Sequence, residues 1–345
     1  MRVVRVREHG GLERLLFEEA PLPTPGPGEV RVAVKAAALN HLDVWVRRGV
    51  PGHAFPLPLV PGCDGAGVVE ATGPGVPASR VGERVVLAPG HACGACAACA
   101  AGRDHLCRRY GIFGETRDGT CADAIVVPAR NAIAIPKGLP FETAAAFPLA
   151  YLTAWHMLVA RAELRPGETV LVHAAGSGVS TAAIQVARLL GAGRIFATTS
   201  TAEKAARARA LGADEVLDYG REDVPARVRE LTGKAGVDVV VDHVGKSTLA
   251  GSLRSLARGG RVVTCGATSG REVAIDLNAV FFKSLSLLGS TMGSLGEVHE
   301  VLAHVVAGRL APVIDAVLPL SQVAEGHRRL EAREVFGKIV LVPEA

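Results

Sequence analysis

The spacing of hydrophobic and polar residues changes along the chain, and the first part has the texture of a β domain. Up to about residue 135, short alternating runs are separated by stretches rich in proline and glycine, such as the segment 21–29. The expected strands are Met1–Val6, Glu29–Ala36, Gly65–Ala71, Arg84–Ala88 and Ala124–Val127. This pattern predicts a mostly antiparallel β domain.

Between about residues 141 and 290, strands alternate with helices. The expected strands are Thr169–Ala174, Arg194–Thr199, Glu215–Tyr219, Val237–Asp242, Arg261–Ala267 and Leu285–Gly289. Most of them lack polar alternation, which is typical of a parallel sheet buried on both faces. Right-handed crossovers through the intervening helices then give a doubly wound α/β fold with six strands.

The last fifty residues show neither the short strands of the first part nor the regular strand–helix alternation of the second. We expect a helix over Leu295–Ala307, a strand near Ala316–Leu320, a further helix and a closing strand over Lys338–Val342. These elements follow a complete six-stranded unit, so they are expected to return to the first domain. The prediction is a discontinuous domain of residues 1–137 and 293–345, interrupted by a doubly wound domain of residues 138–292.

Composition narrows the class of protein. Of 345 residues, 49% are hydrophobic and 21% are charged, which excludes a disordered chain. The net charge of +4 is small and scattered, so no nucleic-acid partner is expected. The start lacks a secretory hydrophobic region and no apolar run reaches 18 residues. We therefore expect a soluble cytoplasmic protein that acts on a small molecule and has no membrane partner.

Four of the seven cysteines, Cys93, Cys96, Cys99 and Cys107, lie in one loop. In a reducing cytoplasm, this packing indicates metal binding rather than disulfides. Four thiolates match a closed tetrahedral zinc site, which leaves no position for water or substrate. The prediction is one structural zinc that folds a lobe of about residues 90–110. Free or redox-active thiols and an iron–sulfur cluster are the alternatives.

The first strand of the α/β domain leads into a turn of small residues that opens a helix. The candidate cofactor contacts are Gly176, Ser177, Gly178 and Val179, where the backbone can approach a pyrophosphate at the helix N-terminus. Ser180 replaces the last glycine of the usual dinucleotide fingerprint. An ordinary strand–helix turn is the alternative to a dinucleotide site.

The end of the second strand bears on the choice of cofactor. An acidic residue there would bind the adenosine 2′-hydroxyl and repel a 2′-phosphate, and none is present at the strand end by Thr199. Ser200 can donate to a phosphate, and Lys204 and Arg207 add positive charge. The chemistry favours NADP(H), with NAD(H) as the alternative if these cations only form a solvated helix face. Further candidate contacts at strand ends are Tyr219, His243 and Gly266.

Five motifs together resemble the medium-chain dehydrogenase/reductase superfamily, which includes zinc alcohol dehydrogenases and quinone oxidoreductases. They are Pro61-Gly-Cys-Asp-Gly-Ala-Gly67, the four-cysteine lobe, the turn Ala175–Ser180, Val237-Asp-Val-Val-Val-Asp-His-Val-Gly245 and Phe336-Gly-Lys-Ile-Val340. The resemblance spans nearly the whole chain. It implies a GroES-like catalytic domain, a six-stranded Rossmann domain and a homodimer or homotetramer. It also implies that Thr153 lies near the nicotinamide ring.

The resemblance also marks three positions at which zinc alcohol dehydrogenases hold a catalytic zinc. Here these positions carry Asn40, Cys63 and Leu149, and a leucine cannot coordinate a metal. The segment containing Asn40 and Asp43 instead resembles the zinc-independent quinone oxidoreductases. Asn40, Asp43 and Cys63 are therefore candidate catalytic residues. Asn40 and Asp43 could equally be helix N-caps, and Cys63 could simply be a small buried hydrophobic residue.

These observations favour an NAD(P)H-dependent oxidoreductase that reduces quinones or activated alkenes and carbonyls by hydride transfer without a catalytic metal. One alternative is a zinc-dependent alcohol dehydrogenase with an unusual ligand set, such as Cys63, Asp64 and His41. Another is a non-catalytic NADPH-binding protein. The fold by itself does not choose among these functions.

Overall fold

The protein folds into two compact units, seen here in a computed structural model that describes residues 1–344. The first unit comprises Met1–Ala150 and Gly293–Ala345, and the second comprises Tyr151–Met292. The segment 138–150, expected to begin the α/β domain, thus belongs with the first unit. The reason is that α3 (Phe141–Ala146) packs its buried alanines against strands of the first unit.

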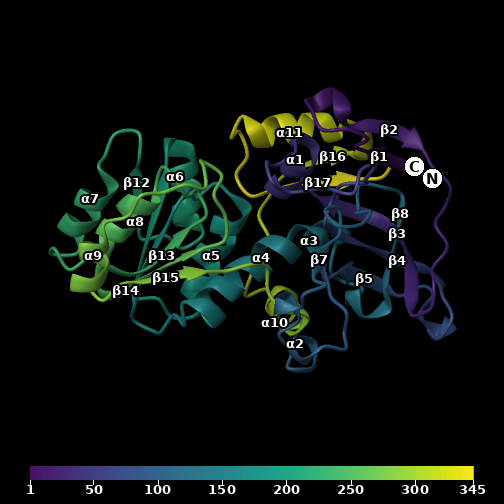
Figure 1. Ribbon diagram of the computed structural model, residues 1–345, viewed down its shortest axis with the longest axis horizontal. Helices are drawn as coiled ribbons and strands as arrows, with labels where there is room; N and C mark the ends of the chain where they lie inside the picture. Colours follow the sequence, from purple (N-terminus) through teal and green to yellow (C-terminus); the bar gives the residue numbers. More distant parts are fainter. Residues whose placement is uncertain (345) are drawn as a thin grey trace. The chain divides into compact units, whose positions relative to one another are not determined.

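The first unit is built on a seven-stranded sheet that joins both ends of the chain (Figure 1). Its strand order is β16-β17-β3-β4-β5-β9, and β8 also pairs with β3. β16 and β17 are parallel, and the other pairs are antiparallel. The bounds are β3 Glu29–Ala38, β4 Asp64–Thr72, β5 Arg84–Leu87, β8 Ala124–Pro128, β9 Ala132–Ala134, β16 Ile314–Pro319 and β17 Lys338–Val342.

Alternation along the strands explains the core of this unit. Val30, Val32 and Val34 point to one face of β3 and are buried there with Ile339 and Leu341 of β17. Two small sheets, β1 (Arg2–Arg5) with β2 (Leu16–Glu19) and β6 (Gly90–His91) with β7 (Gly111–Ile112), complete the strands. The remaining helices of this unit are α1 His41–Arg48, α2 Ala97–Ala100, α10 Leu295–Val306 and α11 Val323–Glu331, and α4 Pro148–Trp155 begins in it.

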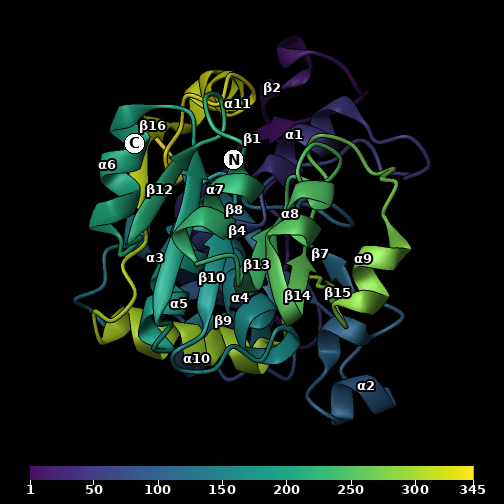
Figure 2. The ribbon, with the colours of Figure 1, turned by 90° about the vertical axis from the view of Figure 1, so that its left-hand side faces the viewer.

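The second unit is the doubly wound domain that the sequence predicts. Six parallel strands follow the order β12-β11-β10-β13-β14-β15, with β12 at one edge and β15 at the other (Figure 2). Their bounds are β10 Thr169–Val172, β11 Arg194–Thr199, β12 Glu215–Asp218, β13 Val237–Asp242, β14 Leu256–Thr264 and β15 Ser286–Gly289. The helices are α5 Gly178–Leu189, α6 Ala202–Ala210, α7 Val224–Leu231, α8 Leu249–Ser255 and α9 Leu277–Phe282, and a π-helical turn spans His156–Arg161.

Both faces of this sheet are buried, which accounts for the nearly continuous apolar strands. Leu171, Phe196 and Val240 share a core cluster with residues of α7 and α8. The intervening residues, such as Val170 and Val239, are also fully buried, and α5 packs on β10 and β11. The dinucleotide turn and the other strand ends are therefore carried by a rigid sheet.

Within residues 1–344, none of the helices combines the length and the apolar character that crossing a bilayer would require.

Candidate functional site

The four cysteines of the lobe converge as the sequence predicts. The sulfur atoms of Cys93, Cys96, Cys99 and Cys107 all lie within 4.8 Å of one another. The Sγ–Sγ distance is 3.8 Å between Cys93 and Cys99 and 3.6 Å between Cys96 and Cys99. A tetrahedral zinc with Zn–S bonds of about 2.3 Å would place its sulfurs about 3.8 Å apart. The donor set therefore fits one zinc ion with four thiolate ligands.

Backbone donors beside Cys93 favour its thiolate form, whereas burial raises the pKa of Cys99 to about 11. The amide of Ala95 donates to Cys93 Sγ over 3.5 Å, and that of Arg109 donates to Cys107 Sγ over 3.3 Å. Hydrogen bonds from the backbone amides of Ala95 and Cys96 lower the pKa of Cys93 to about 5. These contacts are the polar surroundings expected around metal-bound sulfur.

Asp104 anchors the lobe to the returning C-terminal segment. Its Oδ1 accepts a hydrogen bond from the backbone amide of Leu295, the first residue of α10, over 3.0 Å. A carboxylate at a helix N-terminus satisfies an amide that has no partner inside the helix. The lobe is thus fastened to an element nearly two hundred residues away in sequence.

At the positions of the catalytic zinc ligands, the structure has a different arrangement. Asn40 caps α1, and Asp43, at the third helical position, completes a capping box with it. Asp43 accepts hydrogen bonds from the amides of Asn40 and Gly62, over 2.7 and 3.0 Å. Burial raises the pKa of Asp43 to about 6. Asn40 is thus the N-cap of α1 and Asp43 is its partner at the third helical position, and their catalytic role stays a prediction.

A buried lysine from the last strand completes this arrangement. Lys338 Nζ lies 3.0 Å from Asp64 Oδ2 and donates a short hydrogen bond to Asn40 Oδ1. Lys338 and Asp64 are 3% and 0% exposed, so the pair is shielded from water. The other oxygen of Asp64 accepts from the amide of Leu149 over 2.8 Å. We call Asn40, Asp43, Cys63, Asp64 and Lys338 the buried lysine cluster.

Cys63 belongs to the same cluster but is not disposed to bind a metal. Asn40 Nδ2 donates to Asp64 Oδ2 over 2.9 Å and lies 3.3 Å from Cys63 Sγ. Burial raises the pKa of the Cys63 thiol well above its ordinary value, which keeps it protonated.

The unusual ligand set of Cys63, Asp64 and His41 does not form among residues 1–344, where the four-cysteine group is the one metal-type cluster present. His41 is exposed and packs its ring against Trp45.

The turn between β10 and α5 has the geometry expected of a pyrophosphate site. Ser177 is the N-cap of α5, and Gly176, Ser177, Gly178 and Val179 are half-buried between buried neighbours. The first amides of a helix have no partner within it, so those of Gly178 and Val179 can bind an anion. Small side chains and an accessible helix N-terminus together fit a dinucleotide diphosphate.

The end of β11 also carries the groups that the sequence predicts. Ser200 follows the strand and is exposed, and Thr201 caps α6, the helix that carries Lys204. Tyr219 follows the neighbouring strand and its amide donates to Thr199 O over 3.1 Å. Ser200, Lys204 and Tyr219 therefore gather at one corner of the sheet. β11 itself ends without a carboxylate, and the register partner of its last residue, Thr199, is Asp218 of β12.

Sequence reasoning missed a buried polar network at the same edge of the sheet. His173 Nε2 lies 2.9 Å from Ser252 Oγ, which donates to Asp242 Oδ2 over 2.7 Å. The other oxygen of Asp242 accepts from the amides of Val244 and Gly245. The network ties the end of β10 to the loop after β13, where a Cβ added at Gly266 would lie 3.1 Å from the carbonyl oxygen of His243. An aspartate and a histidine that end apolar strands were the available signal.

Thr153 is buried in α4 within the second unit. Its place in the candidate site rests on the resemblance and stays a prediction. Lys338 was also missed, although a lysine within the apolar strand Lys338–Val342 is the kind of buried cation that needs a partner.

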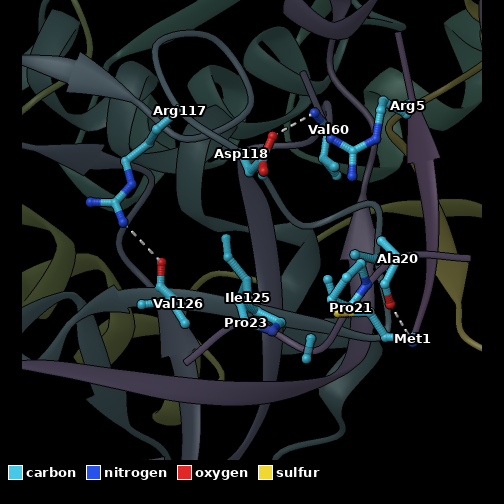
Figure 3. A pocket seen from close by; sticks show the side chains of 13 residues that line it. Met1, Arg5, Ala20, Pro21, Pro23, Val60, Arg117, Asp118, Ile125 and Val126 are labelled. Carbon is cyan, nitrogen blue, oxygen red and sulfur yellow. Dashed lines mark hydrogen bonds between the residues drawn. The ribbon is translucent and has the colours of Figure 1, made fainter. Parts of the chain in front are cut away.

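A cavity of about 350 Å³ in the first unit lies apart from these groups (Figure 3). Arg5, Arg117 and Asp118 are the charged residues among its walls, and all three are engaged. Arg5 pairs with Glu18, Arg117 pairs with Glu29, and Asp118 accepts from the amide of Val60. The lining includes no residue of the lobe or of the buried lysine cluster.

Comparison with known proteins agrees with this geometry over the whole chain. Residues 26–137 match the family model of the alcohol dehydrogenase GroES-like domain, and residues 178–307 match that of the zinc-binding dehydrogenases. A quinone oxidoreductase of Pseudomonas aeruginosa is 34% identical, over 99% of both chains. A 2-haloacrylate reductase of a Burkholderia species is 33% identical, over 99% of this chain and 98% of the relative.

A solved structure gives the same answer. The crystal structure of an NAD-dependent alcohol dehydrogenase superposes with a TM-score of 0.95 and is 53% identical, over the full length of both chains. The two domain models, the full-length relatives and the superposition all agree. The chain therefore belongs to the medium-chain dehydrogenase/reductase superfamily and is an NAD(P)-dependent oxidoreductase.

Proposed function

We propose that the protein reduces quinones or activated alkenes and carbonyls by hydride transfer without a catalytic metal. The observation that carries this proposal is the buried lysine cluster. Lys338 already supplies the positive charge that balances Asp64, and it also engages Asn40. With Leu149 at the third position, a metal would have neither three ligands nor an open coordination site.

The substrate class follows from what such a site can activate. A catalytic zinc polarises a substrate oxygen and lowers the pKa of an alcohol, so simple alcohols need it. Quinones and alkenes conjugated to a carbonyl accept hydride readily without it. The nicotinamide supplies the hydride when bound, and the protein binds it, orients it and keeps water away. A quinone oxidoreductase and a haloacrylate reductase among the relatives support this class.

A zinc alcohol dehydrogenase is the second candidate, because the 53% identical structure is that of an alcohol dehydrogenase. Zinc per chain and turnover of a panel of quinones, enones and alcohols separate the two. We expect one zinc, and reductase activity that survives chelators too weak to strip the four-cysteine lobe. Two zincs, with alcohol oxidation abolished in Cys63→Ala, would restore the alcohol dehydrogenase. Dinucleotide binding without any turnover would instead favour a non-catalytic protein.

We propose NADP(H) as the preferred cofactor. Ser200 and Lys204, together with the absence of a carboxylate at the end of β11, support a 2′-phosphate at this corner. A charge-assisted phosphate contact contributes about 1–2 kcal/mol, so Lys204→Ala should lower the NADPH-to-NADH ratio of kcat/KM about tenfold. Lys234→Ala, on an exposed turn of the same unit, is the matched control. Equal efficiency with both cofactors in the wild-type protein would contradict the preference.

The lobe, the assembly and the compartment complete the proposal. The four-cysteine lobe would hold one structural zinc and take no part in hydride transfer. Edge strand β15 exposes Leu287, and nearby α9 exposes Phe281 and Phe282, which supports a homodimer or homotetramer. Light scattering on the purified chain tests the assembly. The cytoplasm, which keeps the four thiols reduced, is the proposed compartment.

A further inference from the structure

The dinucleotide turn has a serine, Ser180, where the usual fingerprint ends in a glycine. The hydroxyl of this serine needs hydrogen-bond partners. Ser180 stands where a glycine would pack helix against strand, and its side chain is fully buried. A buried hydroxyl without hydrogen bonds is costly. Ser180 Oγ donates to the carbonyl oxygen of His173 over 2.6 Å, which uses its single hydrogen. The lone pairs of this oxygen still require a donor.

His243, from the loop after β13, supplies that donor. Its Nε2 lies 2.8 Å from Ser180 Oγ and 3.1 Å from Ser177 Oγ. Because the Ser180 hydrogen is committed to the carbonyl of His173, the imidazole must donate. This assigns the proton of His243 to Nε2. One ring N–H therefore reaches both hydroxyls of the turn.

The imidazole of His243 also bears on the orientation of the N-cap residue, Ser177. Ser177 Oγ accepts from the amide of Ser180 over 3.3 Å and also lies within reach of the imidazole. Ser177 Oγ also lies 3.4 Å from Ser180 Oγ, so the two hydroxyls and the imidazole form one connected group at the N-cap. His243 directly follows Asp242, the last residue of β13, so the imidazole is carried by the strand next to β10.

We propose that His243 and Ser180 act as one unit in place of the last fingerprint glycine. In this unit, His243 is a positioning residue that sets Ser177 and the first amides of α5 toward the dinucleotide diphosphate. This inference rests on the proposed dinucleotide binding at the turn. It implies that His243 matters only while the Ser180 hydroxyl is present. Removing both side chains restores the glycine geometry and removes the need for a donor.

A double-mutant cycle tests this dependence. The variants are His243→Ala, Ser180→Gly and the double variant, with His243→Gln as a conservative variant that keeps an N–H donor. Dissociation constants are measured by calorimetry for NADPH and for ADP-ribose, which keeps the diphosphate but lacks the nicotinamide. The melting temperature of each ligand-free variant is recorded alongside. His299→Ala, on the exposed face of α10, is the control.

We expect His243→Ala to weaken both ligands about tenfold, because the buried Ser180 hydroxyl loses its donor and then disturbs the neighbouring N-cap, Ser177. Ser180→Gly and the double variant should stay within about threefold of the wild-type protein, so the two effects are not additive. His243→Gln should recover most of the affinity. An equal loss for ADP-ribose and NADPH places the effect at the shared diphosphate half of the ligand.

Three outcomes would overturn the inference. If the double variant binds as weakly as His243→Ala, the imidazole acts on the ligand directly and not through Ser180. If His243→Ala lowers the melting temperature but leaves both dissociation constants unchanged, its role is only structural. If the wild-type protein binds neither ligand, the proposed function fails first, and this inference fails with it.

Discussion

The four-cysteine lobe and the buried lysine cluster lie in the same unit. The lobe has a donor set that fits a metal ion, and the cluster does not. The lobe brings four sulfurs together within one short segment of chain. The cluster places a lysine ammonium on an aspartate, at the positions where zinc alcohol dehydrogenases hold their catalytic metal. Zinc would balance the thiolates of the largely half-buried lobe, whereas a lysine balances the buried carboxylate of the cluster. The two regions should therefore respond differently to substitutions and to pH.

The largest effect is expected from removing one sulfur of the lobe. Cys96→Ser should reduce bound zinc from one per chain to nearly none, because three thiolates leave a structural site open. Atomic emission after dialysis measures this. Cys63→Ser is the matched variant in the cluster and should leave the zinc content unchanged. A wild-type protein that is metal-free, stable and freely reactive at its thiols would show that the lobe interpretation is wrong.

The next effect concerns the lysine. Lys338→Met keeps the length of the side chain but leaves Asp64 buried without its counter-charge. Such a loss should lower the free energy of unfolding by about 3–5 kcal/mol, with zinc content unchanged. Urea unfolding measures the change. Adding Asp64→Asn to Lys338→Met should recover part of the loss. If Lys338→Met alone changes the free energy of unfolding by less than about 1 kcal/mol, the ion pair does not stabilise the cluster.

The pH dependence of the two regions should also differ in sign. The folded-state pKa of Asp43 is about 6, above its ordinary value of 3.8. Its contribution to stability is therefore full below pH 3.8 and is lost as pH rises through about 6. Unfolding measured from about pH 4 to about pH 8 should show the wild-type protein losing stability relative to Asp43→Asn as pH rises.

The lobe should behave in the opposite way. Falling pH protonates thiolates and releases zinc, so zinc binding should weaken in the acid range where Asp43 is most favourable. Zinc retention followed over the same pH range provides this comparison. Zinc loss that rises with pH, or an Asp43→Asn difference that does not change with pH, would contradict the assignment.

The smallest effect is expected at an exposed ion pair. Arg227 and Glu230 lie on the surface of α7, 2.7 Å apart. Water screens such a pair, so Arg227→Met should leave the unfolding midpoint unchanged within error. A loss as large as that of Lys338→Met would show that burial is not what distinguishes the lysine cluster.

Elements that carry their own periodicity were predictable from the sequence. The strands β11 and β13 have the predicted bounds, because six consecutive apolar-rich residues between turn signals leave little choice. β14 begins five residues earlier than expected, since the chain passes directly from α8 into it at Leu256. The short α9 was missed, because five of its six residues are apolar and so short a run shows no helical period.

The candidate site was predictable where its members are close in sequence. Spacing alone predicts the lobe, since four ligands lie within one loop. The contact between Lys338 and Asp64 joins residues 274 positions apart, and no local pattern encodes it. The same holds for His243, which was expected near the cofactor. Its hydrogen bonds to Ser177 and Ser180 depend on how β10 and β13 lie side by side.

The return of the C-terminal segment to the first unit has a consequence for synthesis on the ribosome. β3 can pair with β4 and β8 early, but β17 and Lys338 leave the ribosome only at the end of translation. Until then, Asp64 and Asn40 have no ammonium group. Asp104 gains the amide of Leu295 earlier, but only after the whole second unit has been made. The second unit, continuous from Tyr151 to Met292, can fold in the meantime. In a nascent chain stalled before residue 338, the second unit should therefore resist proteases, and residues of the first unit should be cleaved.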